Sequence, residues 1–360
     1  MRAGLISLGS TSSKWVAEAM EKYFDEVDMI QLKNIEVRLG KGAGVFYEGE
    51  PLQHYDCLYV KGSFRYAQLL RSIASMLEGK VPYMPLSSSS FTIAHNKLLT
   101  HLALQQKNIP MPKTYIPSTI EAAKEKVLKE VNYPIVMKFP EGTQGKGGMF
   151  ADSFSSASSL LDALGALNQP FIIQEYIETG GKDIRALVVG GKVVAAMRRV
   201  AKTDEKRANI HAGGTGESVD LDRISRKLAL DSAEALGTEV CGVDILDGPL
   251  GPVVIEANIS PGLQGLSKVS TIDIPNEIAR FMFEKTQGIL GVKKKEESST
   301  VMKDLGLEEK EGQGIIINLD FRGERILLPK LITDMSLFSD RGEYMIKAKK
   351  GKLEIEEFKI

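Results

Sequence analysis

The segment GVDILDGPLGPVVIEAN, at residues 242–258, constrains the fold of this chain more than any other. Two runs of strand-forming apolar residues flank a turn rich in Gly and Pro, a pattern that predicts an antiparallel β-hairpin. Asp244 falls on the first arm, whereas Glu256 and Asn258 share one face of the second, because side chains alternate with period two. If the arms pair about residue 249, Asp244 lies opposite Glu256 or one diagonal step from it. The hairpin therefore gathers two carboxylates and an amide on a half-buried sheet.

These three side chains have the chemistry of a site for a divalent cation. Two carboxylates about 4 Å apart repel each other by about 4 kcal/mol at an effective dielectric constant of ~20. A cation bound between them, or a shared proton, relieves that repulsion. Oxygen ligands from Asp, Glu and Asn, without Cys or His, suit Mg²⁺ or Mn²⁺. The alternative is a polar sheet edge with solvated side chains, but an acid on each arm followed by NISPG favours the metal site.

A glycine-rich loop, KFPEGTQGKGGMF at residues 138–150, predicts a lid over a phosphate group. It is not a Walker A loop, because that motif needs Ser or Thr after its lysine, and Lys146 is followed by Gly147. Four glycines at positions 142, 145, 147 and 148 disfavour a helix or strand, while their backbone N–H groups can surround phosphate oxygens. Lys138 stands at the base of the loop, and Lys97, which opens a predicted helix, supplies a second cation. An ordinary hairpin loop is the alternative.

Two further segments carry polar residues suited to a nucleotide. The strand IIQEYI leads into Glu175, Tyr176 and Ile177, where apolar surroundings and backbone groups could clamp an adenine ring. Asp183, on the next strand, could accept a hydrogen bond from a ribose hydroxyl. The segment MRRVAKTDEKRANIHAGG, at residues 197–214, concentrates arginines that could stabilise a transferring phosphoryl group, although a single arginine is more often a solvated surface residue.

The order of apolar and polar segments indicates several domains, for which 360 residues suffice. Strands alternate with helices to about residue 90, which predicts a parallel, doubly wound unit. Its first turn, LGSTSSK, holds a single glycine and favours a structural turn over a phosphate loop. From about residue 289 the chain is highly charged with little apolar periodicity, which predicts a solvated linker. The alternating segments after it predict a small β-rich unit.

Composition excludes several classes of protein. Lys and Arg number 46 against 47 Asp and Glu, so a formal charge of −1 gives no field that attracts nucleic acid or anionic membrane. No stretch reaches the ~18 apolar residues of a membrane span. Cys57 and Cys241 lie in apolar runs as reduced core residues, and four scattered histidines form no zinc motif. We expect a cytoplasmic protein without nucleic-acid or membrane partners, and homo-oligomerisation stays open.

Over about residues 95 to 285, the chain resembles the ATP-grasp ligases of the RimK-like α-L-glutamate ligase family. The resemblance is carried by Lys97 and by the segments VMKFPEGTQGKGG, QEYIETGGKDIRALVV, RRVAK, RANIHAGG, GVDIL and IEANISPGL. The resemblance implies an α/β and α+β fold, in which a doubly wound pre-ATP-grasp domain precedes a two-lobed ATP-grasp fold and a small β-rich C-terminal extension. The implied domains are the N-terminal domain at 1–94, the central lobe with its glycine-rich lid at 95–175, the lobe with the metal site at 176–290, the charged linker at 291–313 and the extension at 314–360.

The resemblance also implies that ATP lies between the two lobes. The implied ATP-binding residues are Lys97, Lys138, Gly142, Gln144, Gly145, Lys146, Gly147, Gly148, Gln174, Glu175, Tyr176, Ile177, Asp183 and Arg185. Two Mg²⁺ or Mn²⁺ ions are implied at Asp244, Glu256 and Asn258, and the residues facing the transferred phosphate are Arg199, Arg207 and Asn209. Residues implied at the substrate are His211, Ser260 and Gly262.

Members of this family form amides: ATP phosphorylates a carboxylate, an amine attacks the acyl phosphate, and ADP and phosphate leave. The implied partners are ATP, an amino acid expected to be L-glutamate, and an unidentified carboxylate acceptor such as a small cofactor, a peptide or a protein C-terminus. One alternative is another ATP-grasp amide ligase, similar to glutathione synthetase or to D-Ala–D-Ala ligase. Another is a nucleotide-binding regulatory protein without turnover, against which the intact metal triad and both lysines argue.

The chain departs from the family pattern at three places. Asn96 stands before Lys97 where the family commonly has Asp, which we interpret as an exchange of one helix cap for another. Ala212 replaces a basic residue that is common there, so the contact to the amino acid or acceptor is open. The tail beyond residue 290 is not part of the usual pattern, and could cover the acceptor entrance, build an oligomer contact or be an appendage.

Overall fold

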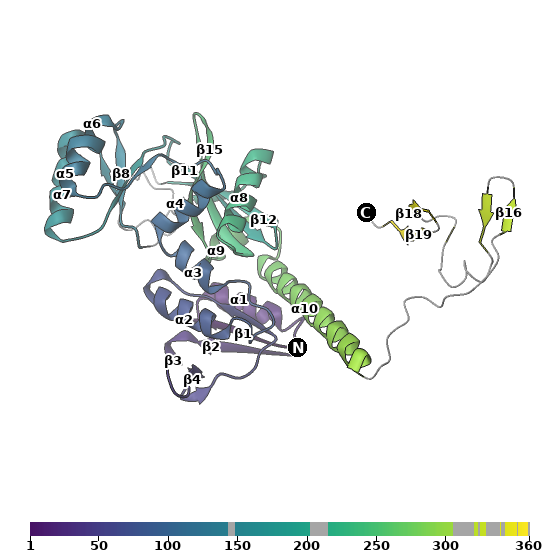
Figure 1. The fold of residues 1–360 in the computed structure, drawn as a ribbon. Helices are drawn as coiled ribbons and strands as arrows, with labels where there is room; N and C mark the ends of the chain where they lie inside the picture. Colours follow the sequence, from purple (N-terminus) through teal and green to yellow (C-terminus); the bar gives the residue numbers. More distant parts are fainter. Residues whose placement is uncertain are drawn as a thin grey trace. The chain divides into compact units, whose positions relative to one another are not determined.

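A parallel sheet opens the chain in the computed structural model, which describes residues 1–142, 148–201, 215–304, 320–322, 325–328, 339, 343–350 and 352–358. The chain divides into two units, Met1–Glu296 and Glu297–Ile360, and each is described by itself (Figure 1). The strands of the first sheet are β1 (Arg2–Ser7), β2 (Glu26–Gln31) and β6 (Cys57–Val60), in the order β2-β1-β6 with parallel pairing throughout. The predicted parallel N-terminal unit is confirmed.

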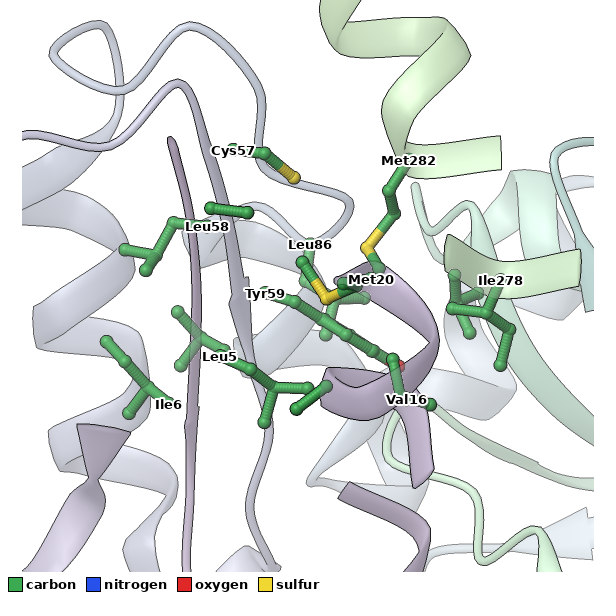
Figure 2. Packing of buried hydrophobic residues seen from close by; sticks show 14 of the residues in the cluster. Leu5, Ile6, Val16, Met20, Cys57, Leu58, Tyr59, Leu86, Ile278 and Met282 are labelled. Carbon is green, nitrogen blue, oxygen red and sulfur yellow. The ribbon is translucent and has the colours of Figure 1, made fainter. Parts of the chain in front are cut away.

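The elements around this sheet are α1 (Thr11–Met20), η1 (Leu32–Asn34), η2 (Phe64–Tyr66), α2 (Ala67–Leu77) and a small antiparallel sheet of β3 (Ile35–Arg38), β4 (Gly44–Tyr47) and β5 (Glu50–Pro51). Tyr59 of β6 is fully buried in one hydrophobic cluster with Val16 and Met20 of α1 and with Ile278 and Met282 (Figure 2). The last two belong to α10 (Ile274–Asp304). This shared core ties the first ninety residues to a helix that comes almost 200 residues later in the sequence.

A second sheet forms the middle lobe. Its strands are β7 (Thr114–Tyr115), β8 (Ile135–Lys138), β9 (Gly148–Ala151) and β10 (Ile172–Glu175), all antiparallel in the order β7-β10-β8-β9. The helices and helical turns around it are α3 (Ser88–Ala94), α4 (Lys97–Gln106), α5 (Ile120–Ala122), η3 (Ala123–Val127), α6 (Leu128–Glu130) and α7 (Phe154–Ala166). Asn96 caps α4, because its side chain accepts hydrogen bonds from the backbone N–H groups of Leu98 and Leu99. The cap that we inferred at Asn96 is confirmed.

The third sheet has five antiparallel strands and carries the predicted hairpin. Its strands are β11 (Lys182–Val189), β12 (Lys192–Val200), β13 (Thr215–Ser218), β14 (Val240–Gly248) and β15 (Gly251–Asn258), in the order β13-β12-β11-β14-β15. The helix α8 (Arg223–Ala235) covers one face, and α9 (Gln264–Val269) follows β15. Asp244 pairs with Glu256 across β14 and β15, as the turn signals predicted.

The charged segment after residue 290 begins as part of a helix. α10 continues as one helix to Asp304, so the first residues of the linker that we expected at 291–313 are helical, and the linker itself stays a prediction. Lys, Glu and Met have high helix propensity, so this charged segment extends a helix without an apolar stripe of its own. The second unit contains two hairpins, β16 (Asp320–Arg322) with β17 (Arg325–Leu327) and β18 (Tyr344–Lys349) with β19 (Lys352–Glu357). Among the residues that the structure describes, no helix is both long enough and apolar enough to cross a bilayer.

Candidate active site

Three of the four sheets of the first unit contribute to one cavity of about 510 Å³. Every predicted site residue within the described part of the chain lines it. These residues are Lys97, Lys138, Gly142, Gly148, Gln174, Glu175, Tyr176, Ile177, Asp183, Arg185, Arg199, Asp244, Glu256, Asn258, Ser260 and Gly262. The cavity thus brings together residues that span more than 160 positions of the sequence, although their individual roles stay predictions.

The remaining candidates lie outside the described residues. These are Gln144, Gly145, Lys146 and Gly147 of the glycine loop, and Arg207, Asn209 and His211 of the segment after β12, together with the departure at Ala212.

Four charged side chains form a ladder across β12, β11 and β14. Arg185 donates from Nε to Asp244 Oδ1 and from Nη2 to Oδ2, each at 2.7 Å. Arg199 donates to both oxygens of Asp183 at 2.5 Å, and its Nη2 lies 2.9 Å from Asp244 Oδ2. The strand registers explain the contacts, since Arg185 is opposite Asp244 and Asp183 is opposite Arg199. Two positive and two negative charges therefore cancel inside the sheet.

The ladder sets the protonation of its two carboxylates. Burial alone would raise the pKa of Asp244, but attraction to Arg185 and Arg199 and their hydrogen bonds outweigh burial and lower that pKa to about 2. Burial raises the pKa of Asp183 to about 6, and the hydrogen bonds from Arg199 limit the rise. Both carboxylates are therefore charged at neutral pH. Asp183 is bonded to Arg199 through both oxygens, and its contact with a ribose hydroxyl stays a prediction.

The hairpin provides oxygen atoms that fit a divalent cation. Glu256 is half-buried, lines the cavity and makes no hydrogen bond or ion pair with the described residues. Asn258 lies two positions further along β15, and its Oδ1 accepts the N–H of Ser260 at 2.9 Å. Asp244 Oδ1 accepts one hydrogen bond from the described residues, and a carboxylate oxygen can accept two, so one position stays open. The donor set is of the hard oxygen type that Mg²⁺ and Mn²⁺ prefer.

A buried hydrogen-bond chain positions the two lysines. Lys97 donates from Nζ to the carbonyl of Gly142 at 2.8 Å, at the base of the glycine loop, and Lys138 donates to Gln174 Oε1 at 2.5 Å. Gln174 is 1% exposed, and its amide nitrogen contacts His101 Nε2 and Thr114 Oγ1, both at 3.0 Å. Because the amide donates to Nε2, the Nδ1 of His101 carries the proton and donates to the carbonyl of Lys97.

Burial dominates the electrostatics of both lysines. It lowers the pKa of Lys138 to about 8, and it lowers the pKa of Lys97 as well, with Glu256 opposing both shifts. The ammonium groups of Lys97 and Lys138, balanced in part by the carboxylate of Glu256, leave room for a strongly anionic ligand. Triphosphate is such a ligand.

The wall beside β10 is apolar and narrow. Phe150 and Tyr176 meet edge to face with ring centroids 5.8 Å apart, and both line the cavity. Ile177 approaches Gly248 so closely that a Cβ added at Gly248 would lie 2.6 Å from its Cγ2 atom. Val136 and Leu246 line the same cavity, so a flat aromatic ring can be held between side chains from two sheets.

Sequence reasoning missed the residues that the N-terminal sheet contributes. Lys61 follows β6 directly, and Ser10, Ser12 and Ser13 lie at the start of α1; all four line the cavity, as does His95 after α3. A usable signal was present at Lys61, because ligands bind at the carboxyl ends of parallel strands, and Lys61 is the first residue after a buried strand. The serines lie in the turn LGSTSSK at the carboxyl end of β1, which we interpreted as a structural turn because it holds a single glycine.

Comparison with known proteins places this arrangement in a family. Residues 94–282 match the RimK-like ATP-grasp domain. A probable alpha-L-glutamate ligase 2 of Pseudoalteromonas atlantica is 35% identical over 278 residues, which are 77% of this chain and 92% of that protein.

Two solved structures share the fold. The ATP-grasp ligase PsnB, in complex with a phosphomimetic variant of its minimal precursor, Mg and ADP, has a TM-score of 0.63 at 17% identity, covering 79% of this chain and 98% of that one. A RimK domain ATP-grasp protein of Sphaerobacter thermophilus has a TM-score of 0.61 at 20% identity, covering 78% and 99%. The expected fold class and family are confirmed, and the chain belongs to the RimK-like family of ATP-grasp ligases.

Proposed function

We propose that this protein joins a carboxylate to an amine at the expense of ATP, and that it adds L-glutamate to an acid acceptor. The observation that carries this proposal is the single cavity in which Lys97, Lys138, two arginines and the oxygen atoms of the hairpin converge. The relative from P. atlantica is named a probable alpha-L-glutamate ligase, which supports glutamate as the amino acid.

In the proposed reaction, a carboxylate oxygen of the acceptor attacks the γ-phosphorus of ATP, the bond to the β-phosphate oxygen breaks, and ADP leaves. The amine nitrogen then attacks the acyl carbon, the carbon–oxygen bond to phosphate breaks, and the amine loses a proton as the amide forms. Lys138 and Lys97 neutralise negative charge on the triphosphate, as cations do in phosphoryl transfer. Arg199, held by Asp183, presents a fixed guanidinium to the transferred phosphate.

Asp244, Glu256 and Asn258 would hold Mg²⁺ or Mn²⁺, as two ions, beside the phosphates. A divalent ion bound there neutralises phosphate oxygens and orients them. Gln174 positions the ammonium group of Lys138 for the phosphates, because its buried amide accepts a hydrogen bond from that group. The apolar wall of Phe150, Tyr176 and Ile177 would receive the adenine ring.

The proposed domains are the N-terminal domain at 1–94, the ATP-grasp lobes at 95–175 and 176–290, the charged linker at 291–313 and the β-rich extension at 314–360. A protein that consumes ATP and carries no span among its described helices suits the cytoplasm, where we place it.

The test measures ADP release with Mg²⁺ across a panel of amino acids, each combined with small dicarboxylates, peptides and cell-extract acceptors, followed by mass measurement of the products. We expect ADP release that depends on L-glutamate and a product heavier than its acceptor by one glutamyl residue. Glu256→Gln serves as the matched control, because it removes one charge from the cavity and little volume. ADP release by that variant at the rate of the wild type, or a product that contains another amino acid, would contradict the proposal.

A further inference from the structure

Lys61 is a buried lysine for which the reaction described above has no use. Its side chain is 4% exposed, and it lines the cavity from the N-terminal sheet. Its ammonium lies 5.4 Å from the ring centroid of Tyr59, two residues earlier in the chain. Among the described residues, no carboxylate or carbonyl accepts a hydrogen bond from it.

The charge of Lys61 is therefore uncompensated within the described part of the chain. Burial lowers its pKa to about 8, and no neighbouring carboxylate opposes that shift, in contrast to Lys97 and Lys138, on which Glu256 acts. Lysine is almost never fully buried unless it is paired. The location of the Lys61 ammonium beside the cavity is best explained by a bound ligand that carries a negative charge.

A second positive feature faces the same part of the cavity. The first residues of α1 include Ser10, which caps the ten-residue helix, and Ser12 and Ser13, and all three line the cavity. The N-terminal end of a helix carries partial positive charge and backbone N–H groups that bind anions. β1 and β6 both end here, and they are adjacent parallel strands, which is where α/β sheets bind ligands.

Four hydrogen bonds fix this corner next to the predicted metal ligands. The N–H of Gly62 donates to Ser260 Oγ at 3.2 Å, and Ser260 in turn donates its N–H to Asn258. The N–H of Leu263 donates to Ser12 Oγ at 2.8 Å, and that hydroxyl donates to Gln264 Oε1 at 2.8 Å. The loop after β15 therefore links Asn258 to both Lys61 and the start of α1.

We propose that Lys61 and the N-terminal end of α1 bind a substrate carboxylate that is not consumed in amide formation. This inference rests on the proposed ligase function, and it restricts the substrates: one of them carries a carboxylate that takes no part in the reaction. That carboxylate belongs either to the acid acceptor or to the added amino acid, and both sources have the same chemistry. A single carboxylate satisfies the ammonium through charge-assisted hydrogen bonds.

The test compares the wild-type protein with Lys61→Met, which keeps the length of the side chain, and with Lys61→Arg, which keeps its charge. Lys14→Met is the control, because Lys14 is an exposed lysine on α1 that does not line the cavity. Calorimetry measures the binding of Mg²⁺ and ADP first, and then of L-glutamate and of glutarate to the ADP-loaded proteins. Glutarate has no amine, so it can occupy the acid position alone, whereas the dimethyl ester of L-glutamate has an amine and no free carboxylate.

We expect Lys61→Met to weaken binding of glutarate, L-glutamate or both by at least about tenfold, the loss of one charge-assisted hydrogen bond. Lys61→Arg should stay within about threefold of the wild type, and Lys14→Met and the binding of ADP should not change. Loss of glutarate binding assigns the carboxylate to the acceptor; loss of L-glutamate binding alone assigns it to the amino acid.

Three results would overturn the assignment: unchanged binding of both acids by Lys61→Met, no binding of either acid by the ADP-loaded wild type, or loss of ADP binding instead. The dimethyl ester of L-glutamate, which has no free carboxylate, should bind to the wild type and to all variants with the same affinity. A wild-type protein that does not bind Mg²⁺ and ADP at all would refute the proposed function itself, which keeps the two failures distinct.

Discussion

Replacing Asp244 by Asn tests how much the charged ladder contributes to stability. The Asp244 carboxylate accepts two hydrogen bonds from Arg185 and lies 2.9 Å from a nitrogen of Arg199, whose side chain is 5% exposed. Asparagine has nearly the same shape, but its amide nitrogen cannot accept a hydrogen bond. The change leaves two buried guanidinium groups with Asp183 as their remaining partner in the ladder. Breaking a buried ion pair in this way costs about 3–5 kcal/mol.

The assay is thermal unfolding of the ligand-free protein at pH 7. A loss of about 3–5 kcal/mol lowers the melting temperature by roughly 10 °C, at about 2–4 °C for each kcal/mol. Glu256→Gln is the matched comparison, because Glu256 has no bonded partner among the described residues, and it should melt within about 2 °C of the wild type. Both variants should lose turnover. The reasoning is refuted if Asp244→Asn melts like the wild type, or if Glu256→Gln is destabilised as strongly.

Three further changes test other parts of the site. Lys61→Met should stabilise the protein by up to about 3 kcal/mol at pH 7, since a pKa lowered from 10.5 to about 8 is a shift of 2.5 units at 1.36 kcal/mol each. Between pH 8 and 10.5 the unfolded chain holds more protons at Lys61 than the folded chain, so the free energy of unfolding of the wild type should rise with pH over that window. Unfolding measurements at several pH values should show that Lys61→Met lacks the part of this rise that comes from Lys61. Gln174→Leu removes the partner of Lys138 and leaves His101 Nε2 without its donor, so we expect a loss of about 1–3 kcal/mol and an increased KM for ATP; an unchanged KM would show that Lys138 does not need this amide. Gly248→Ala places a Cβ 2.6 Å from Ile177, so ADP should bind more weakly in calorimetry. Gly288→Ala, where a Cβ meets nothing within 4 Å, should leave ADP binding unchanged.

Local rules predicted the parts of the site that depend on neighbouring residues. The turn between β14 and β15 set which residues pair, so the contact of Asp244 with Glu256 followed from the sequence. The cap of α4 at Asn96 followed from its side chain in the same way.

Contacts between distant strands were beyond such rules. The bonds from Arg199 to Asp183 and Asp244 depend on the register of β11 with both of its neighbours, which the sequence of a single strand does not encode. Lys61 reaches the cavity because the N-terminal sheet packs on the loop after β15, about 200 residues away. The helical end of α10 was missed because apolar periodicity is a weak guide where helix propensity decides.

The central claim is that Asp244, Glu256 and Asn258 bind a divalent cation beside the nucleotide. Electron paramagnetic resonance of Mn²⁺, titrated into the protein in the presence of ADP, measures this directly, since bound Mn²⁺ loses the signal of the free ion. We predict tight Mn²⁺ binding by the wild type and affinities at least about tenfold lower for Glu256→Gln and Asn258→Ala, because each removes one oxygen ligand. Mn²⁺ affinities equal to that of the wild type in both variants would contradict the claim.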